Sequence, residues 1–387
     1  MADMLFGFVF PNERVYWGLL IVIYPFITCV ATGTFFVSTL DHLFKKESLK
    51  AVSNFALLAS LAFVAFASLP LLLHLGHPER AFNIMFTPSP TSAMATFGYI
   101  YALYVGLVVL EVWFVFRPQI VESARAGTGA KGTFYSILAL GVKDISEASS
   151  RLDKGIIKVL AFLRVPTACV LSGYVGFIFG SLAAVPLWSS PLIPLIFLLS
   201  AVACGVALIV VLYVVWMKAR RWKMDARCIR SLSAYLWSFL VLSGVLQILN
   251  LLHSTYGSRP DWRFAFQTLS REFPFSFLGL QVVAGFIVPF FLLSALLLVK
   301  MKDGLRNVLA VISSALVLVH VFAFLWNLII GGQLASRTLK GAVSFHPEFM
   351  GKEGILVSAF ILLCPVVFLY VLTKILPPFE KNVQAAG

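Results

Sequence analysis

Nine blocks of apolar residues run through this sequence, and each block is long enough to cross a lipid bilayer. A membrane-spanning helix needs about 20 predominantly apolar residues. Charged residues make up only 12% of the chain, whereas ordinary soluble domains contain roughly 25%. We therefore predict an all-α polytopic membrane protein with about nine transmembrane helices, at residues 15–40, 52–75, 93–116, 156–183, 192–217, 232–252, 275–299, 305–330 and 354–376.

The nine predicted helices divide into two groups of four and one extra helix at the C-terminus. The connection at residues 185–191 is short, so the helices on either side of it should be antiparallel neighbours. We predict two four-helix bundles, in residues 1–190 and 191–387, with the ninth helix added to the second. Residues 1–13 contain no Lys or Arg, and the first apolar block is too long for a signal peptide, so it should remain as the first helix.

The positive charge of the chain is concentrated in connections that would share one side of the membrane. Lys and Arg total 30 against 17 Asp and Glu, and the connections at residues 117–154 and 217–230 carry the densest clusters. Because cytoplasmic connections carry an excess of Lys and Arg, we predict a protein of the cytoplasmic membrane with its N-terminus outside and its C-terminus in the cytoplasm. This distribution indicates the lipid membrane, and not nucleic acid, as a partner.

Four ionisable residues lie toward the predicted cytoplasmic ends of the first, third and fourth helices. Glu111 and Arg164 belong to adjacent antiparallel helices, and at 1.5 Å per residue their depths differ by only about 5 Å. We expect an ion pair, which is either purely structural or one step of a proton path. Asp41 and His42, at the end of the first helix, are either interfacial residues or the entrance to such a path.

A second polar group lies toward the predicted outer face of the same helices. His74, His77 and Arg80 close the second helix, while Tyr24 and Tyr174 lie in the outer halves of the first and fourth. Such side chains can donate to a quinone carbonyl and exchange protons, with apolar walls for the tail. We predict a quinone site here, with His74, His77 and Tyr174 as the reactive groups. Each residue alone is also typical of the membrane interface.

The predicted second bundle carries a polar stripe of its own. Gln247, Asn250 and His253 follow one another at three-residue spacing on the sixth helix, and His320 and Asn327 share a face of the eighth. Hydrogen bonds between helices explain these residues, and a second ligand or proton site is the alternative.

The long connections should carry surface features. Residues 134–152 alternate apolar and polar side chains at roughly helical spacing, which predicts an amphipathic helix in the cytoplasmic interface. The predicted outer connections at residues 254–274 and 331–353 mix aromatic and charged residues. Together with the turn at residues 77–90 they are candidates for a docking surface, since loops on a rigid scaffold often carry function.

The five cysteines form no CxxC or CxxCH pattern. We therefore expect no iron–sulfur cluster, haem or other metal site in this chain. A membrane anchor for two b-type haems needs several histidines inside the helices, and only His320 lies well inside a span. A secondary transporter should show a substrate site at the membrane midplane, whereas the charges here lie away from it. Both classes remain weaker alternatives.

Two segments resemble the NrfD/PsrC family of membrane subunits. Residues 68–98, SLPLLLHLGHPERAFNIMFTPSPTSAMATFG, are similar to the family's signature between its second and third helices, with a His-Leu-Gly segment, a turn containing Pro78 and Arg80, and a Pro-Ser-Pro-Thr-Ser segment. Residues 172–201, SGYVGFIFGSLAAVPLWSSPLIPLIFLLSA, resemble its tyrosine-bearing fourth helix and the following Pro-Leu-Trp turn. The resemblance covers helices one to five, and the later helices match in hydropathy only.

The resemblance implies a quinone-interacting subunit of a multi-subunit respiratory redox complex, with menaquinone or menaquinol as the bound substrate. It also implies a ferredoxin-like iron–sulfur subunit on the outer face, other redox subunits of the complex, and a chain without its own redox cofactor. The family's quinone-contacting tyrosine corresponds to Tyr174. Its polar residue early in the first helix has no clear match, and Tyr24 is the nearest candidate. The length and the ninth helix are more similar to the DsrP-type subunit associated with sulfite reduction than to the shorter polysulfide reductase anchor.

Overall fold

The computed structural model describes residues 14–379 except residues 88, 90, 143, 258 and 337–340. Within these residues, nine helical segments are long and apolar enough to cross a membrane. The prediction of an all-α polytopic protein with about nine transmembrane helices is therefore confirmed. The nine segments are α1 (Leu19–His42), α2 with α3 (Lys50–Ala67 and Leu69–His74), α5 (Ala93–Ala126), α7 (Glu147–Gly180), α8 (Ile193–Ala219), α9 (Ala226–Tyr256), η3 with α11 (Phe275–Ile287 and Val288–Leu298), α12 (Asp303–Gln333) and α13 (Ile355–Ile375).

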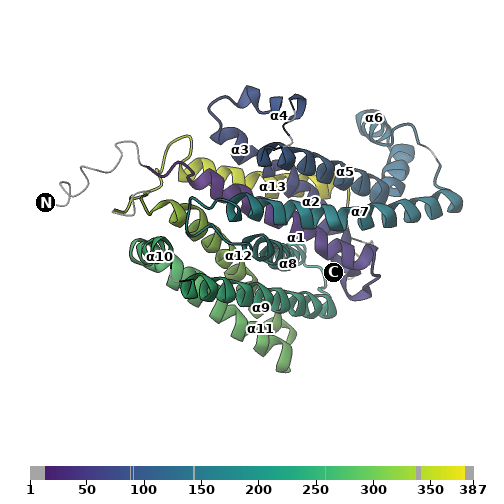
Figure 1. The fold of residues 1–387 in the computed structure, drawn as a ribbon. Coiled ribbons are helices and arrows are strands. Elements are labelled where there is room, and N and C mark those ends of the chain that lie inside the picture. Colours follow the sequence, from purple (N-terminus) through teal and green to yellow (C-terminus); the bar gives the residue numbers. More distant parts are fainter. Residues whose placement is uncertain are drawn as a thin grey trace.

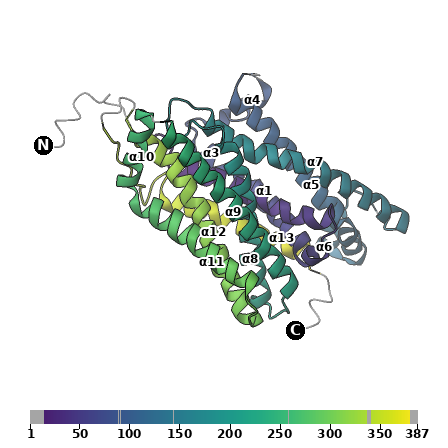
Figure 2. The same ribbon diagram turned by 60° about the horizontal axis from the view of Figure 1, so that its bottom comes forward.

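The spans form two bundles that meet along α1 and α8. α1, α2, α5 and α7 pack together as the first bundle, while α8, α9, α12 and the η3–α11 segment form the second bundle. Figure 2 shows α5 and α7 on one side of the molecule, α9, α11 and α12 on the other, and α1 between them. α1 contacts helices of both bundles and is the most buried of the spans. The division of the chain at residue 190 stays a prediction.

Two glycines allow the close crossing of α1 and α8. A Cβ atom on Gly33 would lie 1.9 Å from the carbonyl oxygen of Ala201, and one on Gly205 would lie 2.0 Å from the carbonyl carbon of Gly33. Small residues let membrane helices approach until their backbones touch. The two bundles are therefore joined backbone to backbone at this crossing.

The ninth helix, α13, packs against the first bundle, although it comes last in the chain. It lies beside α2 and also contacts α1 and α3, and Figure 1 shows it in yellow behind α2. The loop before it is attached to the end of α3, where His74 Nδ1 lies 2.7 Å from Glu353 Oε1 and Lys352 donates to the carbonyl of Leu75. Sequence order alone had placed this helix with the second bundle.

The second predicted span, at residues 52–75, is not one continuous helix. It breaks at Ser68, where α2 ends and α3 begins. Pro70 lies in the first turn of α3, and it has no N–H with which to continue the hydrogen bonds of α2. The short helix α3 is therefore not a continuation of α2, and its direction is set by its own contacts. His74 is the last residue of α3.

The amphipathic helix predicted at residues 134–152 is wrong as a single element. It is interrupted after α6 (Gly129–Leu138), where Leu140 and Gly141 have positive φ angles of 52° and 76°. The chain then begins α7 with Ser146 as its N-cap. The Ser146 N–H and hydroxyl donate to the carboxylate of Asp144, which lowers the pKa of Asp144 below its ordinary value. The N-cap at Ser146 starts a new helix, so the alternation of apolar and polar residues over 134–152 does not belong to one helix.

We call the two ends of the molecule the predicted outer end and the predicted inner end, after the predicted topology. The predicted outer end holds α4 (Asn83–Phe86) and α10 (Pro260–Glu272), and the predicted inner end holds α6. Figure 1 shows α10 at the left and α6 at the right. The orientation itself stays a prediction. Within the predicted outer connections, residues 88, 90, 258 and 337–340 lie outside the described residues.

Candidate functional site

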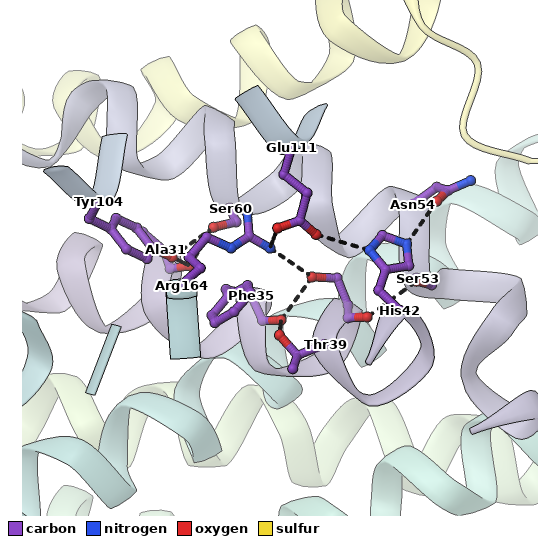
Figure 3. Close-up of polar contacts among 11 residues, drawn as sticks. Ala31, Phe35, Thr39, His42, Ser53, Asn54, Ser60, Tyr104, Glu111 and Arg164 are labelled. Carbon is purple, nitrogen blue, oxygen red and sulfur yellow. Dashed lines mark hydrogen bonds and ion pairs between the residues drawn. The ribbon is translucent and has the colours of Figure 1, made fainter. Parts of the chain in front are cut away.

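A charged cluster is buried between the helices of the first bundle (Figure 3). Arg164 Nη2 on α7 lies 3.1 Å from Glu111 Oε2 on α5, and neither side chain is exposed. His42 Nδ1, in the last turn of α1, lies 3.0 Å from the other carboxylate oxygen of Glu111. The predicted contact between Glu111 and Arg164 is therefore present, and Glu111 links α1 to α7.

Neutral groups surround this cluster. His42 Nε2 lies 3.3 Å from Asn54 Oδ1 on α2, Arg164 donates to Ser38 Oγ at 3.3 Å, and the guanidinium carbon lies 3.7 Å from the centre of the Phe35 ring. Nε and Nη1 of Arg164 have no hydrogen-bond partner among the described residues. Because a buried charge requires partners for its polar atoms, Arg164 is only partly satisfied in this arrangement.

The cluster is a chain of titratable groups that reaches toward the predicted inner end. The His42 side chain is 10% exposed, whereas Glu111 and Arg164 are fully buried. A proton on His42 can therefore pass to the Glu111 carboxylate along an existing hydrogen bond. Asp41 is half-buried beside His42 and is not part of the chain. The use of these four residues as a proton path stays a prediction.

The outer half of the first bundle contains an aromatic wall around Tyr24. The Tyr24 ring meets Phe97 edge to face with centroids 5.4 Å apart, and Phe97 stacks on Tyr101 at 5.9 Å. Tyr24 is only 4% exposed, and its hydroxyl has no hydrogen-bond partner in the part of the chain that the structure describes. Since buried polar groups are nearly always hydrogen-bonded, this hydroxyl is an unsatisfied donor.

The other predicted outer residues lie at different depths. The Tyr174 hydroxyl donates to the carbonyl of Ala93 at 3.0 Å, so Tyr174 and Tyr24 both lie against the first turns of α5. His74 is held by the loop before α13. His77 and Arg80 are exposed on the turn after α3, where both contact Glu79. The structure therefore brings the two tyrosines to the same helix and leaves His77 and Arg80 at the surface.

The polar stripe of the second bundle meets a residue that the sequence did not point to, Gln281 of η3. Gln247 Nε2 lies 3.2 Å from His320 Nε2, and Asn327 donates to the side chain of Gln281 at 2.8 Å. His253 is exposed on α9 and is not part of this group. A cavity of about 220 Å³ is bordered by five polar side chains, Gln247, Asn250, Gln281, His320 and Asn327.

Four histidines are engaged in hydrogen bonds, namely His42, His74, His77 and His320. Both ring nitrogens of His320 have partners, the carbonyl of Gln281 at 2.8 Å and the side chain of Gln247. Among the described residues, no three His, Cys, Asp or Glu side chains lie together in a way that would hold a metal ion. A site for b-type haem would require His320 to give up one of these bonds.

Sequence reasoning missed Asn54 and Gln281. Asn54 is the only amide side chain in the predicted span at residues 52–75, and Gln281 is the only one in the span at residues 275–299. A lone amide in an apolar block is a usable signal, because polar groups in lipid require partners. The partners themselves, His42 for Asn54 and Gln247 for Gln281, come from distant parts of the chain.

Comparison with known proteins finds a matching family and several relatives. The sequence model of the family described as "Polysulphide reductase, NrfD" matches residues 8–336. A selenate reductase subunit of Mesobacillus selenatarsenatis is 28% identical over 82% of this chain and 74% of that protein. The Hdr-like menaquinol oxidoreductase integral membrane subunit of Archaeoglobus fulgidus is 22% identical over 84% and 72%, respectively. Protein NrfD of Escherichia coli is 24% identical over 51% and 59%.

Proposed function

This chain belongs to the NrfD polysulphide reductase family, and we propose that it is the quinone-interacting membrane subunit of a multi-subunit respiratory redox complex. In this proposal it exchanges electrons between menaquinone or menaquinol and an iron–sulfur partner subunit at the outer face. The match over residues 8–336 supports it. So do the names of two relatives, one a subunit of selenate reductase and one an integral membrane subunit of a menaquinol oxidoreductase.

The observation that carries the proposal is the buried Tyr24 hydroxyl without a partner among the described residues. Leaving such a group unsatisfied costs about 1–3 kcal/mol, and a quinone carbonyl placed beside it would accept the missing hydrogen bond. Phe97 and Tyr101 supply flat apolar surfaces at the same place, as a quinone ring requires. Tyr24 is therefore the proposed contact to the headgroup on the α1 side, and Tyr174 the contact on the α7 side.

His74 and Glu353 are the proposed route for protons to the predicted outer face. Their side chains are hydrogen-bonded and are 24% and 35% exposed, respectively. Oxidation of one quinol releases two electrons and two protons, and reduction of one quinone consumes the same number. In the proposal the electrons pass to or from the partner subunit, and the imidazole–carboxylate pair accepts or delivers the protons. Arg80 and His77 are exposed beside this route.

Proton movement from the opposite side is part of the same proposal. His42 and Glu111 form the hydrogen-bonded chain that starts near the predicted inner end, and Arg164 holds the Glu111 carboxylate in place. Protonation of Glu111 would neutralise its carboxylate and remove the charge that holds Arg164. The protonation state of Glu111 and the position of the Arg164 guanidinium are therefore coupled. Asp41 lies at the entrance.

Exposed apolar side chains at the predicted outer end support a docking surface for the partner subunit. Phe82 and Phe86, in the turn between α3 and α5, are 65% and 81% exposed, and Phe349 and Met350, before α13, are 64% and 75% exposed. Large apolar groups exposed together mark interaction sites. Cross-links from these four positions to the iron–sulfur subunit are expected in the native complex. Cross-links found only on the connections beside α6 would contradict the docking surface.

Tyr24→Phe in the intact complex tests the quinone site. The substitution keeps the ring and removes one hydrogen bond, worth about 0.5–1.5 kcal/mol, so quinone-linked electron transfer should fall roughly three- to tenfold. Assembly should not change, and thermal stability should stay the same or rise, because the hydroxyl has no partner among the described residues and an unsatisfied buried hydroxyl is destabilising. Tyr213→Phe is the matched control, since it removes a buried hydroxyl that accepts from Asp225 N–H far from the site.

Tyr213→Phe should leave the quinone kinetics unchanged. If Tyr24→Phe and Tyr174→Phe both also leave them unchanged in an assembled complex, the headgroup does not bind between α1 and α7, and this part of the proposal is wrong.

A further inference from the structure

We propose that the cavity of the second bundle is a second binding site, for a flat and neutral ring with carbonyl oxygens such as the headgroup of a membrane quinone. The inference relies on the proposed function only for the presence of quinones as substrates in this membrane. It uses none of the residues of the Tyr24 site. The cavity lies between α9, α10, η3 and α12.

The walls of the cavity suit a flat ring. Phe266, Phe277, Phe286 and Phe324 border it, together with Trp262, which stacks on Phe266 with ring centroids 5.0 Å apart. Aromatic faces and edges pack favourably against another flat ring. The apolar part of the site therefore combines five aromatic rings with seven aliphatic side chains.

Four of the five polar side chains at the cavity, all but Asn250, belong to a single chain of hydrogen bonds whose direction is fixed at one end. His320 Nδ1 donates to the backbone carbonyl of Gln281, which can only accept, so Nε2 of the neutral ring must accept from Gln247 Nε2. The Gln247 oxygen then accepts from Gln281 Nε2 at 3.1 Å, and the Gln281 oxygen accepts from Asn327 Nδ2. Finally, Asn327 Oδ1 accepts from Ser276 at 2.9 Å.

This direction leaves N–H groups available at the cavity. Gln281 and Asn327 each use one amide hydrogen in the chain and have a second one free of it. Asn250 accepts from Ser190 through Oδ1, which leaves its amide hydrogens for a ligand. None of the lining residues is an acid, Lys or Arg. The site therefore offers donors to a neutral acceptor, which is the chemistry of a carbonyl group.

Access to the cavity is from the side of the bundle that faces lipid. Ile248 and Leu251 border it on α9 and are 52% and 37% exposed, and Leu278 and Val283 on the neighbouring η3 are 54% and 50% exposed. A volume of about 220 Å³ is smaller than the roughly 300–1,000 Å³ that holds a whole drug-sized ligand. It suits a headgroup whose isoprenoid tail remains in the bilayer.

The backbone of η3 is unusual at this place. Phe275–Ile287 is π-helical, a rare conformation that is frequent at functional sites. This segment supplies Gln281, whose side chain and carbonyl both take part in the hydrogen-bond chain, and the aromatic wall at Phe277 and Phe286. The π-helical segment thus contributes residues to both the polar and the apolar part of the site.

Photolabelling of the full chain in lipid nanodiscs tests the inference. The probe is an azido-naphthoquinone with a short isoprenoid tail, and labelled peptides are identified by mass spectrometry. Peptides of η3 and α12 should be labelled, and excess menaquinone-4 should compete for the label. Ile248→Trp narrows the mouth without touching the polar chain, so it should reduce this labelling about tenfold through steric overlap. Asn250→Leu removes one donor and should reduce it about threefold.

Leu249→Trp is the matched control, because Leu249 is 47% exposed on the same helix and does not line the cavity. It should leave the labelling unchanged. Labelling of η3 and α12 that Ile248→Trp does not reduce overturns the inference. So does labelling that excess phospholipid displaces and menaquinone-4 does not, since the cavity then holds an acyl chain.

The same experiment separates the two sites. Labelling near Tyr24 with η3 and α12 unlabelled refutes the second site and leaves the proposed function intact. Labelling of η3 and α12 with none near Tyr24 supports the second site and refutes the first.

Discussion

The two bundles hold polar groups inside the membrane in two different ways. In the first bundle, a carboxylate, a guanidinium and an imidazole are in direct contact at Glu111, Arg164 and His42, and two atoms of Arg164 have no hydrogen-bond partner among the described residues. In the second bundle, amides and one imidazole form a neutral chain from Ser276 to His320 in which each link has a donor and an acceptor.

A charged network and a neutral network differ in the chemistry that they can support. A charged cluster responds to the gain or loss of one proton, because the partner of a neutralised group is left as a buried charge. In a neutral chain the gain or loss of a proton is unfavourable in free energy. The N–H groups that the chain does not use can instead donate to a neutral ligand. The Glu111 cluster is therefore the network that we propose for proton movement, and the Gln281 chain is the one that we propose for recognition of a ligand. The following predictions test that contrast between a charged and a neutral network.

The largest effect is expected from Arg164→Met with Glu111 intact. The substitution leaves a fully buried carboxylate without its cation, which should destabilise the protein by about 3–5 kcal/mol. Thermal unfolding in detergent, followed by light scattering and tryptophan fluorescence, measures it. The double variant Glu111→Gln/Arg164→Met should recover most of the loss. An equal loss in the single and double variants would show that the charge on Glu111 is not what matters.

Gly33→Ala should be the next most damaging change, because it separates the two bundles where their backbones touch. The added methyl would lie 1.9 Å from the Ala201 carbonyl oxygen, and overpacking of this kind costs about 1–3 kcal/mol or more. Gly106→Ala is the control, since a Cβ there meets nothing within 4 Å. It should be neutral or slightly stabilising. If both variants behave alike in thermal unfolding, the crossing is looser than described.

Asn327→Leu should cost about 1–3 kcal/mol, less than the loss of Arg164. It leaves the Gln281 side-chain oxygen and the Ser276 hydroxyl without their partner, and both groups are neutral. The same unfolding assay compares the two bundles directly. A loss as large as that of Arg164→Met would remove the distinction between a charged and a neutral network.

The smallest effect concerns α10, which covers the cavity of the second bundle. The side chain of Arg259 donates to Asp261 and holds the pKa of that carboxyl below its ordinary value. Because the folded-state pKa is lowered, the stabilisation is complete above the unfolded value of about 3.9 and is lost as the pH falls through the folded value. An exposed pair of this type contributes about 0–1 kcal/mol.

The neighbouring Trp262 reports on this step. Its fluorescence, obtained as the difference between the wild type and Trp262→Phe in nanodiscs, should stay constant from neutral pH to about pH 4 and change below it. Asp261→Asn should remove the change. A transition above about pH 5, or one that persists in Asp261→Asn, would assign the step to another group.

The class of fold and part of the charged cluster follow from the amino-acid sequence. Nine blocks of apolar residues predicted nine spans. The helices in the described residues lie close to these blocks, except where Pro70 breaks the second span and the N-cap at Ser146 starts α7. The contact between Glu111 and Arg164 was also predictable, because depth in the membrane follows from position along a helix and consecutive spans are antiparallel neighbours. Hydropathy and depth are properties of a residue and its near neighbours in the chain.

The lateral faces along which the helices meet are a property of the tertiary structure. It placed α13 on α2, brought Gln281 to Gln247 and His320, added Asn54 to His42, and left the Tyr24 hydroxyl without a described partner. The apolar blocks carry little rotational information, because a helix that is hydrophobic all round does not indicate which side faces lipid and which faces another helix. Rotation and neighbours are set by packing details such as the Gly33–Gly205 crossing, which involve residues far apart in the chain.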